Sequence, residues 1–466
     1  MKRLARSIAL LLLSIAIGVH GCRKTETPNV ILIVIDTLRA DHLGIYGYTR
    51  ATSPHLDELF RSGTRFENAR ATSSWTLPSV ASILTGLSPA VHGLERSNSM
   101  LSDRTGMMQE AFQKRGYETV ALSANPAFVT PIQGFSRGFD RFTVLHGPPT
   151  GNTSVDASPG NSSLLDWVSR ANADDVTSAA LDWLSSRTSA KPFFLYLHYF
   201  DQHGAYNPPR ELAERFGVAA GDPLAGPAQW PVLQAPEAPD EKTLDVLVSL
   251  YDATIAATDA SIGRLLGGLD PALRASTILV VTADHGEEFG DHGGMQHGRT
   301  LYDELLRVPL VIAGPRIESG AVVSRPVSLI QLWATFAELT GIPAPPASDD
   351  SGANASLLDA AGTQPVYADL DARFQGDLQQ HRRALVEGDW KLIVDPHRGT
   401  TMFELGSDRR ETRDVAPTQS ERRSRMATSI ADRDARAVLR REDAPPGRTS
   451  VDPVMRSRLQ SLGYLQ

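Results

Sequence analysis

The chain has 466 residues, 41% of them hydrophobic, which is long enough for one large globular domain with a smaller one appended. Its formal net charge of −8 excludes a general nucleic-acid binder, because affinity for a phosphate backbone needs a surplus of Lys and Arg. Any anionic ligand must therefore be bound locally, within a site.

The N-terminus has the pattern of a bacterial targeting segment. Three basic residues among the first six precede an apolar stretch at residues 8–19, which is short for a membrane span, and small residues lead to Cys22. We expect a lipoprotein-type signal peptide over residues 1–22 and a lipid anchor at Cys22, with a plain signal peptide or a short membrane anchor as alternatives. The expected location is the bacterial cell envelope, facing the periplasm or the exterior. Because Cys22 is the only cysteine, the chemistry beyond it must use oxygen and nitrogen.

The first strand is predicted at residues 30–35, a continuous apolar run rich in β-branched residues, with Asp36 directly at its carboxyl end. Further along, a turn enters a helix that has Pro78 in its first turn and Gly86 at its end. Thr76 is then expected just before the helix N-terminus, where backbone N–H groups and the helix dipole favour an anion. On these residues alone, an ordinary capping role for Thr76 is the simpler interpretation.

Two further buried strands are predicted, each followed by side chains of the kind that bind metals. They are residues 193–197, followed by His198, Asp201 and His203, and residues 277–282, followed by Asp284 and His285. Shorter strands are expected at residues 119–122 and 309–312, and helices at residues 101–115, 176–186 and 245–269. Strands alternating with helices predict an α/β fold with a doubly wound, mostly parallel sheet, in which ligands bind at the carboxyl ends of the strands.

The last quarter of the chain is expected to be a separate, smaller unit. Residues 28–345 form the predicted catalytic domain, and residues 346–466 a C-terminal α+β subdomain with a charged tail. A strand is predicted at residues 390–394. Residues 409–441 carry many charges of both signs, which is typical of a solvated helix or a flexible connection rather than of a binding site.

Four segments together resemble the sulfatase family of the alkaline-phosphatase superfamily. Residues 29–44 resemble its opening motif, residues 74–86 its nucleophile segment, residues 282–293 its second metal segment and residues 390–415 its C-terminal strand and acidic tail. The four segments follow one another in the family's order, which makes the joint match specific. The resemblance implies an alkaline-phosphatase/sulfatase-like fold.

Residue by residue, the resemblance implies a metal-dependent hydrolase of sulfate or phosphate esters. Asp36, Asp284 and His285 would bind a divalent cation that also contacts Thr76, the nucleophile. Thr76 would attack the sulfur or phosphorus of an ester and form a covalent enzyme ester, which is resolved in a second step. His297 falls where the family places a Lys or His that contacts substrate and leaving group.

Other positions carry weaker expectations. His203 falls at another family histidine, and His203 and His297 are both candidate acids or anion contacts. One divalent cation is expected, calcium, manganese or zinc, and a second would need Asp201, His203 and His297 as ligands. His92 is expected to be structural, and residues 291–292 to support the site from a loop.

The sequence departs from the usual sulfatase pattern at the nucleophile. Sulfatases convert a Cys or Ser, followed two residues later by Pro and four later by Arg, into formylglycine, whereas these positions hold Thr76, Pro78 and Val80. A Gly-Lys-Trp-His group is also missing after Tyr117, where Asn125 is a candidate for one replacement polar contact. We therefore expect a phosphoester or phosphonate substrate. The alternatives are a true sulfuric ester hydrolase of the arylsulfatase type and a catalytically silent envelope lipoprotein.

Overall fold

The computed structural model describes residues 27–146, 170–226, 228–235, 237–345, 354–359, 362, 364–371 and 381–449. The expected signal peptide and Cys22 lie outside these residues. In the described part of the chain, no helix is both long and apolar enough to cross a membrane.

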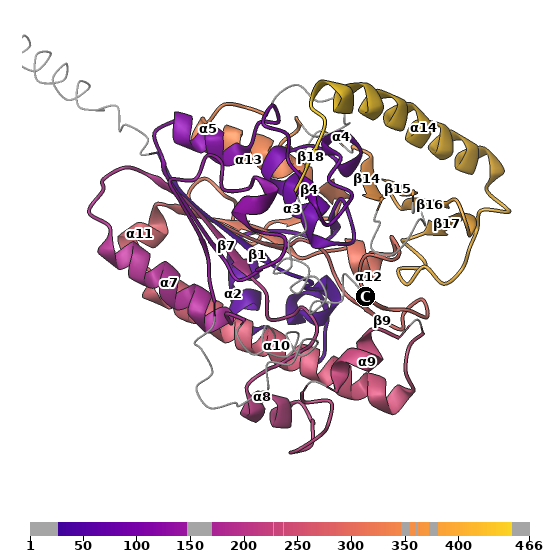
Figure 1. The fold of residues 1–466 in the computed structure, drawn as a ribbon, viewed down its shortest axis with the longest axis horizontal. Coiled ribbons are helices and arrows are strands. Elements are labelled where there is room, and N and C mark those ends of the chain that lie inside the picture. Colours follow the sequence, from indigo (N-terminus) through magenta and orange to yellow (C-terminus); the bar gives the residue numbers. More distant parts are fainter. Residues whose placement is uncertain are drawn as a thin grey trace, which may run out of the picture.

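An eight-stranded mixed sheet forms the centre of the molecule (Figure 1). In order across the sheet, its strands are β12 (Val322–Val323), β2 (Thr64–Phe66), β11 (Leu310–Ala313), β8 (Thr277–Ala283), β1 (Asn29–Ile35), β7 (Phe193–Tyr199), β5 (Glu118–Ser123) and β6 (Arg141–Val144). The five strands from β8 to β6 are parallel. β11 exists where a strand was predicted, but it runs antiparallel to β8. The predicted doubly wound, mostly parallel α/β sheet is thus confirmed.

Helices cover both faces of this sheet, which explains why β1, β7 and β8 are apolar along their whole lengths. One layer contains α2 (Pro54–Ser62), α7 (Ala173–Ser186), α10 (Glu241–Gly268) and α11 (Pro271–Ala275). The other contains α3 (Thr76–Thr85), α4 (Pro89–His92), α5 (Met108–Lys114) and α13 (Leu332–Thr340). Short helices α8 (Arg210–Arg215), α9 (Gln229–Leu233) and α12 (Asp303–Leu306) lie in the connections, together with 3₁₀ turns at Ala40–His42, Gly44–Tyr46, Pro131–Gln133 and Leu329–Gln331.

Two of the predicted boundaries that were wrong are those of the helix expected at residues 101–115 and of the strand expected at residues 193–197. The helix expected at residues 101–115 begins only at Met108, because Gly106 precedes it and the Glu110 carboxylate accepts the Met107 N–H, which fixes the start there. β7 extends to Tyr199, beyond the predicted end, so His198 lies inside the strand and not after it. This second difference matters for the site.

The C-terminal part forms its own antiparallel sheet of β14 (Val366–Leu370), β15 (Arg382–Glu387), β16 (Trp390–Asp395) and β17 (Gly399–Glu404). α14 (Ser420–Asp443) packs on β15 and β16 and reaches α4 of the main domain. The predicted smaller α+β unit is therefore present. Two-stranded pairs complete the structure: β3 (Ala69–Arg70) with β13 (Val327–Ser328), β4 (Ser99–Met100) with β18 (Gly447–Arg448), and β9 (Glu288–Phe289) with β10 (Met295–Gln296).

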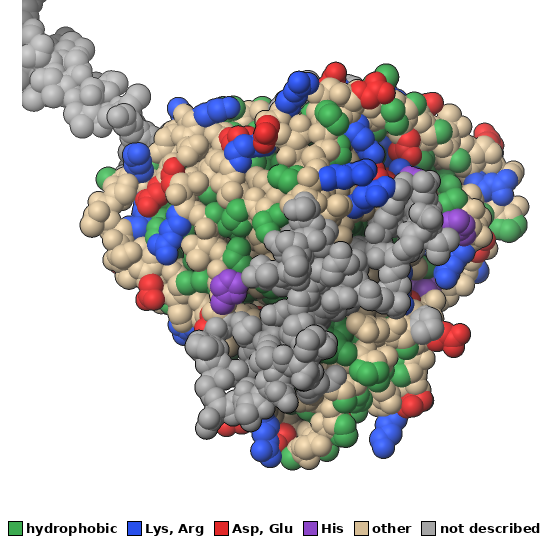
Figure 2. All heavy atoms as spheres, viewed as in Figure 1, with side chains coloured by type: hydrophobic (Ala, Val, Ile, Leu, Met, Phe, Trp, Pro, Cys, Tyr) green, Lys and Arg blue, Asp and Glu red, His purple; other side chains and the backbone are tan. Residues whose placement is uncertain are grey.

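A buried ionic network joins the two parts. Lys391 of β16 is fully buried, and its Nζ lies 2.8 Å from Asp303 Oδ1 and 2.7 Å from Glu411 Oε1. Asp303 also binds Arg70 of β3. On the outside, by contrast, basic and acidic side chains are interspersed over the described part of the face in Figure 2.

Candidate active site

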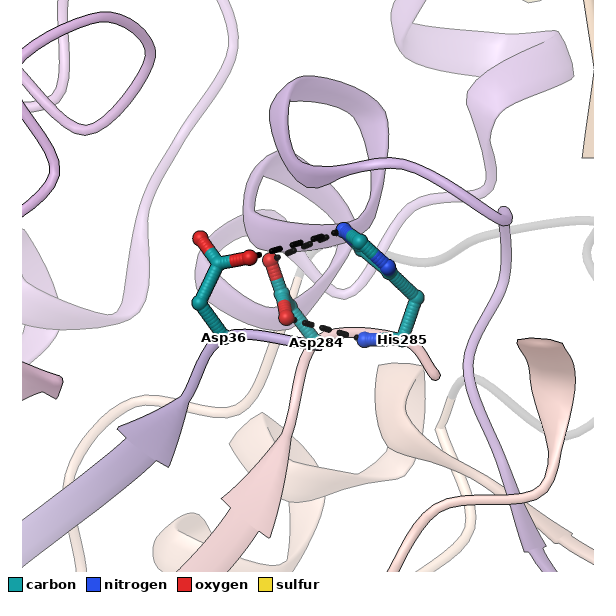
Figure 3. Close-up of side chains that lie close together, drawn as sticks. All are labelled: Asp36, Asp284 and His285. Atoms are coloured by element: carbon teal, nitrogen blue, oxygen red, sulfur yellow. Dashed lines mark hydrogen bonds and ion pairs between the residues drawn. The ribbon is translucent and has the colours of Figure 1, made fainter. Parts of the chain in front are cut away.

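The site forms where parallel strands end together. Asp36 follows β1, and Asp284 and His285 follow β8, which pairs with β1 so that Ile35 lies opposite Ala283. The register therefore brings Asp36 together with Asp284 and His285, which lie 248 and 249 positions further along the chain, at one sheet edge, where the three side chains point toward one another (Figure 3). All three are completely buried.

Each carboxylate has one oxygen held by the protein and one without a partner. Asp284 Oδ1 accepts the N–H groups of Thr37, at 3.2 Å, and His285, at 2.9 Å. Thr37 reaches it from a left-handed conformation with φ of 54°, which is uncommon for a β-branched residue and is a mark of functional sites. Asp284 Oδ2 has no hydrogen-bond partner in the described structure.

Asp36 is arranged in the same way. Its Oδ2 accepts Asn125 Nδ2–H at 2.9 Å and His198 Nε2–H at 3.1 Å, while Oδ1 is buried without a partner in the described structure. The His198 ring is itself oriented by Tyr196, whose hydroxyl lies 2.9 Å from Nδ1. Two neighbouring strands thus fix Asp36 and leave one oxygen aimed into the cluster.

His285 directs a nitrogen lone pair to the same place as the free carboxylate oxygens of Asp36 and Asp284. Its Nδ1 lies 2.9 Å from the Gly286 carbonyl oxygen and must donate to it, which leaves Nε2 unprotonated in the neutral ring. Nε2 is 3.5 Å from Asp284 Oδ2 and 3.8 Å from Asp36 Oδ1. Two unsatisfied carboxylate oxygens and one imidazole nitrogen, all within 4.8 Å of one another, fit a divalent cation.

The electrostatics support this fit. Burial raises the pKa of Asp36, but the hydrogen bond from His198 and the nearby histidines outweigh it and hold the pKa well below its usual range. Burial and the charge of Asp36 raise the pKa of Asp284 well above its usual range. Burial lowers the pKa of His285 to about 3. Two carboxylates this close cannot both ionise without a compensating positive charge, which a cation supplies.

Thr76 lies beside the cluster as the first residue of α3. The residue at the cap position is Trp75, so the capping interpretation of Thr76 is wrong. Thr76 Oγ1 is 3.2 Å from His285 Nε2 and 3.4 Å from Asp36 Oδ2. The first turn of α3 is tied to the second strand end, because Ser79 Oγ donates to the Asp284 carbonyl at 2.5 Å.

His297 and His203 join the cluster from a third side. The His297 ring centroid is 4.6 Å from that of His285 and 5.0 Å from that of His203. His297 Nδ1 lies 2.8 Å from Glu287 Oε1, and His203 Nδ1 lies 2.8 Å from the Gly204 carbonyl oxygen. Burial lowers the pKa of His203 to about 3, so its ring is neutral near pH 7. The structure therefore brings together all six expected residues: Asp36, Thr76, His203, Asp284, His285 and His297.

Asp201 is not placed with them. In the described residues, the cluster with metal-ligand spacing contains only Asp36, Asp284 and His285. Asp201 instead accepts the Ala173 N–H and faces Arg170, and its pKa is raised by burial to about 6. The suggested role of Asp201 in a second metal site is therefore unsupported by its position.

The supporting residues behave as expected. His92 bonds to Ser82 Oγ and to the Pro78 carbonyl and not to a metal ligand, which is a structural role. Asp291 binds Arg39, and His292 binds Glu304.

Sequence reasoning named His198 and Asn125 but missed that they hold Asp36. In the sequence, His198 is a polar residue near the end of a buried strand, and this feature could have indicated its role. Asn125 was proposed to contact substrate, but its Nδ2 is used on Asp36 and its Oδ1 accepts the N–H groups of Ala127 and Phe128. Its position therefore makes it a support for Asp36.

The chain is similar in sequence and in fold to known proteins. The sulfatase family model matches residues 28–342, about two thirds of the chain. An uncharacterized sulfatase of Escherichia coli, YidJ, is 27% identical over 349 residues, which is 69% of either chain. Among solved structures, a 2-O GAG sulfatase has a TM-score of 0.69 at 20% identity, covering 92% of this chain and 96% of its own. The phosphonate monoester hydrolase of Silicibacter pomeroyi has a TM-score of 0.66 at 21% identity, covering 88% and 96%. The chain belongs to the sulfatase family of hydrolases that act on ester bonds.

Proposed function

We propose that the protein is a metal-dependent hydrolase in which Thr76 is the nucleophile, and that its substrate is a phosphoester or phosphonate monoester rather than a sulfate ester. The observation that carries the proposal is the place of Thr76. Its hydroxyl is fully buried at the start of α3, 3.2 Å from His285 Nε2, beside two carboxylate oxygens without partners.

Asp36, Asp284 and His285 would hold the cation, with Thr76 Oγ1 next to it. When bound, the cation would lower the pKa of the Thr76 hydroxyl and screen the charge of the approaching oxyanion. The donor set of hard oxygens with one imidazole suits zinc or manganese, with calcium the usual choice of an all-oxygen site.

The protein groups supply the remaining chemistry. Thr76 Oγ1 forms a bond to phosphorus as the bond to the leaving oxygen breaks, which gives a phosphothreonine ester that water then hydrolyses. The N-terminal end of α3, where backbone N–H groups lack intrahelical partners, favours the negative charge of the transferred group. His297, oriented by Glu287, is the candidate donor of a proton to the leaving oxygen, with His203 beside it.

The preference for phosphorus rests on residues of this chain. Threonine cannot be converted to the formylglycine aldehyde of sulfatases, and Val80, also buried, stands where the conversion motif has its arginine. The fold does not decide the question, because structural relatives include both a sulfatase and a phosphonate monoester hydrolase. Sulfate-ester hydrolysis, the activity in the family's name, is the second candidate.

We also propose that residues 1–22 direct the protein to the bacterial cell envelope and that Cys22 carries a lipid anchor. Support comes from the basic and apolar pattern of the first 22 residues. The catalytic unit would then be residues 28–345, attached to the membrane surface by a short polar tether.

The test compares substrates and metals on the full-length protein purified in detergent. Nitrophenyl esters of sulfate, phosphate, a phosphodiester and a phosphonate are assayed with manganese, zinc or calcium. Thr76→Ala is compared with Thr85→Ala, a buried threonine at the other end of α3. The proposal is supported if the protein hydrolyses phosphorus esters and if Thr76→Ala abolishes this turnover whereas Thr85→Ala does not. Sulfate-ester turnover as the main activity overturns the substrate choice, and inactivity with every metal favours a silent lipoprotein.

A further inference from the structure

A second cleft, of about 660 Å³, opens between the main domain and the loop that follows β17. On one side it is lined by the segment after β1, which contains Arg39 and Tyr48, and by α12 and Arg307. On the other side it is lined by Arg409, Arg410 and Thr412 of the C-terminal part. Its size lies within the range of about 300–1,000 Å³ that is usual for small-molecule sites.

The carboxylates of this cleft already have other basic partners. Each of the four lies within ion-pair distance of a basic side chain: Asp41 and Asp291 with Arg39, Asp303 with Arg70 and Lys391, and Glu304 with His292. Asp41 and Asp291 share one guanidinium, and none of the four carboxylates forms an ion pair with the remaining arginines of the cleft in the described structure. Arg307, Arg409 and Arg410 have no carboxylate within 4 Å among the residues that the structure describes.

Arg307 is the most constrained of the three. Its Nε donates to the Glu67 carbonyl at 3.0 Å and its guanidinium lies 5.5 Å from the Tyr46 ring centroid, so the side chain is fixed while its Nη groups have no acceptor in the described structure. Burial lowers the pKa of Arg307, and the charge of Arg409 across the cleft lowers it further. Asp303 and Asp41 partly offset this repulsion, but neither forms an ion pair with Arg307 or Arg409 within 4 Å in the described structure.

We propose that this cleft is a second anion site, distinct from the Asp36–Asp284–His285 cluster, which binds a phosphate or sulfate group between Arg307 and Arg409. A planar guanidinium donates paired hydrogen bonds to such a group, and the anion would relieve the repulsion of the two arginines. The cleft is much larger than one inorganic ion. Tyr48 and His42, with ring centroids 4.5 Å apart, offer an aromatic surface beside the arginines on which an attached organic ring could pack.

The cleft is separated from the metal cluster by segments of the chain that contact both of them. Arg39, which lines the cleft, donates through Nη1 to the Glu287 carbonyl, two residues beyond His285. The Glu304 backbone packs so closely on Gly286 that a Cβ there would lie 1.9 Å from its oxygen. An anion in the cleft would therefore lie behind the turn that carries His285, and it would bind independently of the metal ligands.

The experiment uses full-length protein in detergent and first locates the anion. Crystals are soaked in tungstate, a tetrahedral oxyanion that anomalous scattering makes visible. We expect a peak between Arg307 and Arg409, and a peak confined to the metal cluster overturns the proposal.

Solution binding then tests the arginines. Inorganic phosphate and glucose 6-phosphate are titrated into Asp284→Asn protein, in which the first anion site is impaired, with and without Arg409→Glu. Arg409 is exposed, so we expect its replacement to leave the fold intact. We expect Arg409→Glu to weaken phosphate binding at least about tenfold, whereas Arg436→Glu, an exposed arginine of α14, has no effect. Equal binding by the Arg409 and Arg436 variants refutes the site. Competition in which glucose 6-phosphate binds more tightly identifies an organic phosphate as the occupant, and binding of inorganic phosphate alone identifies the free ion; either outcome supports the cleft as an anion site.

Discussion

Replacing His198 tests whether the orientation of Asp36 controls the metal site. His198 is fully buried, and its Nε2–H and Asn125 Nδ2–H donate to the same oxygen of Asp36, at 3.1 and 2.9 Å. His198→Leu removes one of the two donors. A hydrogen bond to a charged group contributes about 1.5–3 kcal/mol, and loss of a residue that orients a metal ligand typically costs about 10- to 100-fold in affinity. We expect manganese or zinc affinity to fall by that factor.

The assay is calorimetric titration of the metal into each variant. His198→Gln places an amide N–H near the position of Nε2, so it should recover part of the lost affinity. His92→Leu is the matched control, because His92 is an equally buried histidine bonded to Ser82 and the Pro78 carbonyl instead of to a metal ligand. Wild-type metal affinity in His198→Leu would refute the reasoning, as would an equal loss in His92→Leu.

Two further predictions concern stability. His92 Nδ1 accepts the Leu94 N–H, and burial lowers the pKa of His92 from 6.5 to about 3. Below pH 6.5 the unfolded chain therefore binds a proton at His92 that the folded protein does not bind. The contribution of the neutral His92 to the free energy of unfolding is complete above pH 6.5 and should fall by about 2 kcal/mol between pH 8 and pH 5. Urea unfolding of His92→Gln should lack this pH dependence, and an unchanged slope contradicts the assignment. Lys391→Met would leave Glu411 buried without its cation and Asp303 with Arg70 alone, at a cost of about 3–5 kcal/mol in the free energy of unfolding. The exposed Lys242→Met is its control, and a cost equal to that of the control contradicts the prediction.

The sequence was sufficient to predict the sheet and its main ligands because both follow local rules. The apolar runs that became β1, β7 and β8 are buried on both faces, and parallel strands meet at one carboxyl edge, so Asp36 and Asp284 could be expected to lie together. Family resemblance added His297 and gave Thr76, His203 and His285 their roles.

The supports of the site could not be predicted in the same way. Asn125 and His198 reach Asp36 because β5, β7 and β1 lie side by side in a particular register. His198 of β7 lies opposite Ser123 of β5 on one side and opposite Val34 of β1 on the other. Hydrophobic periodicity gives neither strand order nor register. The direction of β11 was missed for the same reason.

The central claim is that Thr76 carries the transferred group, and the most direct measurement traps it there. Full-length protein loaded with metal is mixed with a fast-reacting phosphorus ester and quenched in acid, and its peptides are mapped by mass spectrometry, with Thr76→Ala treated in parallel. We predict a phosphoryl group on Thr76 during turnover and none in the variant. A phosphoryl group on another residue, or turnover that persists in Thr76→Ala, would contradict the account.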